Sequence, residues 1–412
     1  MDFDRLVENN GVYLYQDNNI NTITIRLNFM GGLSNRDCAI DDLLCYYLAM
    51  TNKNFKNDNE IAQRSKELYS LNLFFSNEYC SKQKYITVDI NLISPESIDV
   101  DYYKDAFEFI RQIINEPDFT NEEMFKIIKR KYLAQRRADL SDIDEYVDSM
   151  YNQTVTPEKN RKYDYATDMR YITRVVNSIT LDELKKEYEY MINNYHSGFV
   201  YGKISEDRFN EFVDSMSLLR TKQEVTYERD VPTIEGETEI DVDGEQSYIY
   251  VTYDMDQVSF AQLRLLRKLL NSSVGLCYQI LREKGGLVYS ASASVLYYLK
   301  KMYFYGEIDK DKKEQFIKGV EEIVRLLQDK DVLNNFLERA KVEMLIDEVY
   351  ISEDADKIVN EVLDSYVLKL YEGLNRTEVN HQILDETADS LYNVTKSLKR
   401  KNVFMARGMD NE

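Results

Sequence analysis

Residues 271–308 read NSSVGLCYQILREKGGLVYSASASVLYYLKKMYFYGEI, and they place Arg282 and Tyr289 seven positions apart. Gly285 and Gly286 lie between them. The last two thirds of this stretch predict two strands. A strand that only had to pack would not need a guanidinium, a flexible break and a phenol in this order. The two glycines predict a sharp turn from a helix into the first strand, which would bring Arg282 and Tyr289 to one place.

The N-terminal half of the chain mixes clear strands with clear helices. ITIRLNF (23–29) alternates apolar and polar residues, as a half-buried strand does, and YITVDINLI (85–93) has the same period. A helix is expected at 103–114. Two further helices are expected after the capping signals Thr120-x-x-Glu123 and Thr180-x-x-Glu183. GFVYGKI (198–204) predicts a closing strand.

The second half repeats this order. Its expected elements are a strand at 248–254, a helix at 259–271, the two strands of the opening stretch, and helices at 310–328, 331–350 and 353–371. Two halves of similar order predict an α+β protein with two similar domains, each an antiparallel sheet with helices on one face. A polar stretch near the midpoint carries Pro232 and several glutamates. We therefore expect domains at 1–220 and 247–412, joined by a linker at 221–246.

Charge and composition exclude several classes of function. The net charge of −21 argues against nucleic acid as the main partner, because phosphate binding needs a basic surface. No run of 18 apolar residues appears, so no membrane span is expected, and the first residues show no secretory pattern. These features predict a cytoplasmic protein. The four scattered cysteines are expected to be reduced and buried, with no disulfide framework.

The chain has only two histidines, His196 and His381, which are 185 residues apart. A catalytic zinc site takes three protein ligands, commonly including a histidine pair at helical spacing. This sequence cannot build such a pair. The prediction is that the chain holds no metal.

Residues 259–350, and the opening stretch above all, resemble the C-terminal half of the M16 (pitrilysin/insulinase-like) zinc peptidases. The N-terminal half is similar in layout and in local patterns such as EIAQRSKELYSLNLFFS. Active members carry H-x-x-E-H on the first helix, whereas CYYLA (45–49) stands at the matching place here. Cys45, Leu48 and Ala49 hold the positions of the first His, the Glu and the second His. Asp41, Asp42 and Cys45 are an alternative ligand set, but the apolar helix face favours a core-facing helix.

The resemblance implies a division of labour between two chains of the M16B type. A zinc-binding partner carrying H-x-x-E-H would supply the metal, so that this chain is inactive alone. Arg282 would hydrogen-bond the carbonyls of a bound peptide, and Tyr289 would donate to the oxyanion formed at the partner's zinc. Gly285 and Gly286 complete the expected substrate-binding segment. The expected substrates are small peptides, such as the leader peptides of ribosomally made natural products, bacteriocins included.

Two alternatives stay open at the level of sequence. Arg282 would be half of a structural ion pair, and Tyr289 a sheet residue with a satisfied hydroxyl, if the pair served only the fold. The whole chain would then be a scaffold or binding protein that kept a peptidase fold without proteolysis.

Overall fold

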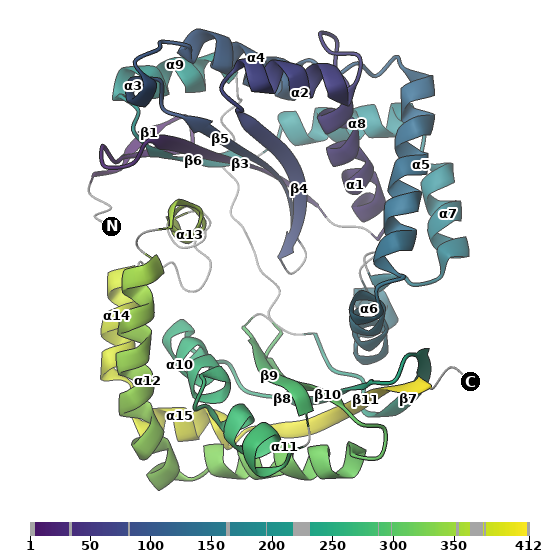
Figure 1. The fold of residues 1–412 in the computed structure, drawn as a ribbon, viewed down its shortest axis with the longest axis vertical. Helices are drawn as coiled ribbons and strands as arrows, with labels where there is room; N and C mark the ends of the chain where they lie inside the picture. The colour runs from purple at the N-terminus through teal and green to yellow at the C-terminus, as the bar shows by residue number, and fades with distance from the viewer. Residues whose placement is uncertain are drawn as a thin grey trace. The chain divides into compact units, whose positions relative to one another are not determined.

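The computed structural model describes residues 5–32, 35–80, 83–161, 165–194, 196–216, 231–286, 288–297, 299–351, 354–362, 374 and 376–409. The chain divides into two compact units, and neither is a single continuous segment (Figure 1). The first unit comprises Met1–Ala138, Asp168–Tyr227 and Asp354–Gly373. The second comprises Asp139–Thr167, Glu228–Glu353 and Leu374–Glu412.

The first unit is built on a six-stranded sheet of order β1-β2-β6-β3-β5-β4. β2 and β6 are parallel, and the other neighbouring pairs are antiparallel. The strands are β1 (Val7–Asn9), β2 (Val12–Gln16), β3 (Thr22–Gly32), β4 (Asn72–Cys80), β5 (Gln83–Ile93) and β6 (His196–Gly202).

The second unit has a five-stranded sheet of order β7-β11-β8-β10-β9, in which only the β7–β11 pair is parallel. The strands are β7 (Gly236–Asp243), β8 (Ser247–Asp254), β9 (Val288–Leu296), β10 (Lys301–Ile308) and β11 (Lys399–Met409).

The two sheets share one topology, apart from the extra strand β1. In each unit the first strand pairs in parallel with the last, the second and fourth strands follow, and the third lies at the edge. The predicted α+β class and the duplication are confirmed. The expected purely antiparallel sheets were wrong in one detail, because the pairing of the first strand with the last runs parallel.

One face of the first sheet is covered by helices from the N-terminal half of the chain (Figure 1). They are α1 (Asn35–Met50), α2 (Asp58–Glu67), α3 (Pro95–Ile98), α4 (Tyr103–Asn115), α5 (Glu122–Asp139), α7 (Met169–Ser178), α8 (Leu181–Ile192) and α9 (Glu206–Met216). The apolar residues of the 23–29 repeat are all buried, as the alternation predicts. Thr24 and Asn28 of the same strand are buried as well, because β3 lies inside the sheet and its second face is covered.

The two predicted capping signals have different outcomes. Thr180 and Glu183 form a complete capping box at the start of α8. Thr120 does not cap α5, because its amide and hydroxyl bond to the Asp118 carboxylate. The side chain of Asn121 accepts the Met124 amide at 2.9 Å instead and so caps the helix one residue later.

The second face of the first sheet is covered by α13 (Ala355–Glu361), which comes from the C-terminal half of the chain (Figure 1). Ile358, Val359 and Val362 pack there against Phe199 and Tyr201 of β6.

The second unit contains α6 (Ile143–Val155), the short helix η2 (Glu158–Asn160), α10 (Phe260–Asn271), η4 (Tyr278–Lys284), α11 (Lys313–Leu327), α12 (Lys330–Ile351), α14 (Arg376–Asp385) and α15 (Ala388–Thr395). α6 and α11 lie on opposite sides of the sheet (Figure 1). α6 is contributed by the N-terminal half of the chain. Its Val147 and Tyr151 are buried in a cluster with Tyr248, Tyr250 and Phe404 of the sheet.

The tyrosine ring at 151 is the centre of this cluster. It stacks on Tyr250 with ring centroids 4.1 Å apart and lies 5.5 Å from the Tyr303 ring and 6.0 Å from the Phe404 ring. Its hydroxyl shares a 2.8 Å hydrogen bond with the Thr252 hydroxyl. Burial raises the pKa of Tyr151, so the phenol stays neutral.

The exchange of α6 and α13 explains two differences from the expected layout. Helices lie on both faces of each sheet, whereas one covered face was expected. Residues 139–167 belong to the second unit, whereas 1–220 was expected as one domain. Part of the expected linker, 236–243, forms strand β7, and its residues 221–230 lie outside the described residues. Of the helix expected at 353–371, the structure describes 354–362.

Candidate functional site around Arg282

The candidate site begins with a tight turn after α10. The Gly275 amide donates to the Ser272 carbonyl at 2.7 Å, and the Gly275 carbonyl accepts the Gln279 amide at 3.0 Å. A Cβ at position 275 would lie 2.6 Å from the Leu270 carbonyl oxygen, which is closer than real contacts allow. Glycine is therefore required for the turn that starts the next helix.

That helix, η4 (Tyr278–Lys284), is a π-helix, a form found mostly as single turns and often at functional sites. The turn and helix have two distinct faces. Leu276, Cys277, Ile280 and Leu281 are buried and anchor the segment. Burial raises the pKa of the Cys277 thiol to about 12, so this cysteine is no nucleophile at neutral pH.

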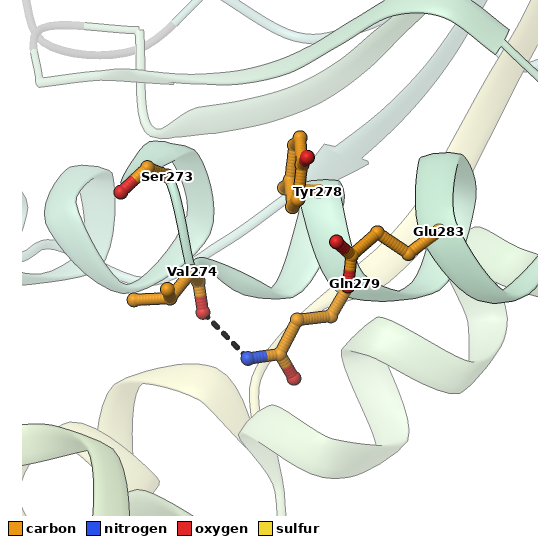
Figure 2. A pocket seen from close by; sticks show the side chains of 5 residues that line it. All are labelled: Ser273, Val274, Tyr278, Gln279 and Glu283. Carbon is orange, nitrogen blue, oxygen red and sulfur yellow. Dashed lines mark hydrogen bonds between the residues drawn. The ribbon is translucent and has the colours of Figure 1, made fainter.

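The outward face carries the chemistry. A pocket of about 470 Å³ is lined by Ser273, Val274, Tyr278, Gln279 and Glu283. Figure 2 shows the first two on the turn and the other three on the helix that follows. The Gln279 amide nitrogen donates to the Val274 carbonyl at 2.7 Å and so ties the helix to the turn.

Arg282 belongs to the same helix, and its side chain is exposed. Its guanidinium carbon lies 5.4 Å from the centroid of the Tyr278 ring, within cation–π range. Among the described residues, no carboxylate forms an ion pair with it. These residues therefore offer no support for the reading of Arg282 as half of a structural ion pair. One side of the guanidinium therefore contacts the Tyr278 ring, and its N–H groups can donate hydrogen bonds to a ligand.

The two glycines of the motif have different backbone requirements. Gly286 has φ +53°, in the left-handed region that favours glycine, and a Cβ there would meet no atom within 4 Å. Its amide donates to the Arg282 carbonyl at 2.9 Å, and its carbonyl accepts the Lys312 ammonium at 3.2 Å. Gly285 has φ −85°, a right-handed value that other residues adopt. The sharp turn that the sequence predicts therefore rests on Gly286.

Tyr289 lies on β9, the edge strand that follows the turn. Its side chain is outside the part of the structure that is described, so a meeting of its hydroxyl with Arg282 stays a prediction. Its backbone lies where the β9–β10 register shifts, between the pairs Gly306↔Ala291 and Ile308↔Val288. Such irregularities re-aim side chains at sheet edges.

α10 holds the strand that carries Tyr289. The Asn271 side chain donates to the Ala293 carbonyl at 2.7 Å and accepts the Ala293 amide at 2.8 Å. Arg267 donates to the Val295 carbonyl at 2.8 Å. The last turns of α10 thus occupy part of the free edge of β9 and fix the position of that strand.

The place of the family's metal motif is filled differently. Cys45 and Leu48 are buried on α1 and Ala49 is exposed; neither Leu48 nor Ala49 has a ligand atom. Asp42 accepts hydrogen bonds from Asn77 and from the Tyr132 hydroxyl. These residues do not fit a zinc ion. Among the described residues, no three His, Cys, Asp or Glu side chains form a group that would hold a metal.

Sequence reasoning missed the residues that line the pocket. Residues 271–284, NSSVGLCYQILREK, do carry a signal for them. Ser272, Ser273 and Gly275 are typical of a turn, and the polar and apolar residues that follow have the spacing of a helix. The spacing did not reveal that this helix is a π-helix.

Comparison with known proteins finds a family model that matches part of the chain. Residues 178–344 match the model of the Peptidase M16 inactive domain. This range of the chain includes the turn, the π-helix and the two strands β9 and β10. No curated protein sequence matches the chain.

Solved structures share the fold over nearly the whole chain. A conserved protein from Enterococcus faecalis superposes with a TM-score of 0.83 at 17% identity, covering 98% of this chain and 97% of that one. A protease from Helicobacter pylori gives 0.76 at 15% identity, with 98% of each chain covered. A peptidase M16 inactive domain from Pseudomonas fluorescens gives 0.70 at 14% identity, with 97% and 96% covered. At these identities the likeness shows the fold: the chain has the fold of M16-like peptidases, and residues 178–344 are similar to the Peptidase M16 inactive domain.

Proposed function

We propose that this chain is the non-metal subunit of a two-chain M16-type endopeptidase. It lends Arg282 and Tyr289 to a zinc site on a partner subunit that carries H-x-x-E-H. The partner's zinc supplies the activated water and polarises the scissile carbonyl. The observation that carries the proposal is the exposed Arg282 guanidinium beside a pocket, on a chain whose first helix carries no H-x-x-E-H motif.

The chemistry assigned to each residue follows from its donors. The planar guanidinium of Arg282 presents several N–H groups and suits two peptide carbonyls at once. The Tyr278 ring beneath it limits its freedom, which lowers the entropy lost when a peptide binds. Tyr289 donates to the oxyanion. The proposed substrates are small peptides in the cytoplasm, leader peptides of ribosomal natural products among them.

The test begins with isolation of the chain together with the protein that co-purifies with it, and with zinc analysis of that complex. Peptide cleavage is then followed for Arg282→Ala and Tyr289→Phe. Loss of one oxyanion donor lowers kcat by about 10²–10³. Arg325→Ala, at an exposed position of α11, is the matched control and should keep the full rate. Full cleavage by both motif variants would refute the proposal.

A non-proteolytic scaffold is the second candidate, favoured by the match to an inactive domain. The two are separated by the co-purifying partner. A zinc-bearing M16 subunit encoded beside this chain supports the peptidase, whereas a complex without zinc and without cleavage supports the scaffold.

A further inference from the structure

The pocket beside Arg282 presents hydrogen-bond acceptors. One N–H of the Gln279 amide donates to the Val274 carbonyl, and the amide oxygen remains to accept a hydrogen bond. The Glu283 carboxylate is an acceptor only, and it forms no ion pair with any described cation. The Ser273 hydroxyl accepts or donates. In Figure 2 the side chains of these residues surround one opening.

The wall formed by Tyr278 suits a positive charge. The face of an aromatic ring attracts a cation, and Arg282 already uses the ring in this way at 5.4 Å. A volume of about 470 Å³ is within the range of ligand sites and admits one long side chain. The net charge of the whole chain, −21, also favours a cationic ligand over an anionic one.

We infer that this pocket binds a lysine or arginine side chain of the peptide substrate, with Glu283 as the residue that determines the preference. Arg282 and Glu283 are consecutive residues of η4, and both are exposed. Arg282 donates hydrogen bonds to a backbone carbonyl of the peptide, and Glu283 binds the cationic side chain of the adjacent peptide residue. The inference rests on the proposed function for the role of Arg282, but the pocket and its acceptors stand on their own geometry.

The test measures direct binding of labelled peptides to the full-length chain by fluorescence anisotropy. Two peptides are compared that differ only in lysine or norleucine at one central position, since norleucine keeps the aliphatic length without the charge. The lysine peptide should bind about two- to five-fold more tightly, the range of one exposed ion pair. Glu283→Gln should abolish the difference.

Glu245→Gln removes the same charge in the turn between β7 and β8, and it should leave the lysine preference intact. Raising the salt concentration should shrink the preference in the native chain.

The outcomes separate this inference from the proposed function. Equal binding of both peptides, with both weakened by Arg282→Ala, overturns the lysine pocket and leaves the proposed function standing. A lysine preference that survives Glu283→Gln also overturns it. Binding that does not respond to Arg282→Ala at all contradicts the proposed role of Arg282 instead.

Discussion

Removing the ring of Tyr151 tests whether α6 is a core element of the second unit. The change Tyr151→Ala deletes a fully buried ring that contacts Tyr250, Tyr303 and Phe404, at centroid distances of 4.1, 5.5 and 6.0 Å. Loss of a buried aromatic side chain costs about 3–5 kcal/mol of the free energy of unfolding. Tyr151→Phe keeps the ring and removes only the hydroxyl bond to Thr252, at about 1–3 kcal/mol.

The assay is differential scanning calorimetry with hydrogen exchange of the amides in β8 and β11. A unit of 150–250 residues loses roughly 2–4 °C of Tm per kcal/mol, so Tyr151→Ala should lower its transition by about 6–20 °C. Protection in β8 and β11 should fall with it, because α6 covers these strands. Tyr190→Ala, an exposed tyrosine of α8 in the other unit, should change stability by less than about 0.5 kcal/mol. A cost for Tyr151→Ala no larger than this control would refute the assignment of α6 to the second core.

Three further predictions concern single contacts. Gly306→Ala places a Cβ 2.4 Å from a ring carbon of Phe316 and should lower the free energy of unfolding by about 1–3 kcal/mol, measured with denaturant. Adding Phe316→Leu should recover part of that loss. If the destabilisations of the two single variants simply add in the double variant, the clash is contradicted. Asn271→Ala removes both hydrogen bonds to Ala293 and should lower the free energy of unfolding by about 1–3 kcal/mol. The amides of β9 should then exchange faster. Unchanged exchange in β9 would show that Asn271 does not hold this strand in place. Burial lowers the pKa of His196 in the folded state, so the unfolded chain takes up the proton first as the pH falls. The free energy of unfolding should therefore decrease as the pH drops below about 6.5. His196→Gln should flatten this dependence of stability on pH, and an equal dependence in both proteins would exclude His196 as its source.

Local patterns in the sequence determined the parts of this protein that depend on near neighbours. The alternation at 23–29 predicts the apolar face of β3. The Thr180 side chain and Glu183, three residues away, form the capping box that begins α8. The repeated order of elements determined the duplicated α+β fold. The alternation and the capping box each lie within one strand or one helical turn, and the order of elements follows from such local patterns, so none of these predictions needs distant contacts.

The motif at 281–290 was visible for the same reason, and the sequence alone excluded a histidine-based zinc site, because the required residues are missing. The left-handed Gly286 follows from the need to turn at the end of a helix. The sequence identified Arg282 as a candidate site residue, but it did not predict the Tyr278 ring and the pocket beside it.

Tertiary structure decided what depends on residues far apart in the chain. Tyr151 meets Tyr250 across a separation of about a hundred residues, so no local period could place α6 on the second sheet or α13 on the first. The parallel pairs join strands far apart in the chain, β2 with β6 in the first unit and β7 with β11 in the second. The π-helical turn that opens the pocket at Tyr278 and Glu283 likewise depends on the core packed beneath it, because the hydrophobic burial that selects among backbone forms acts only once distant side chains have met.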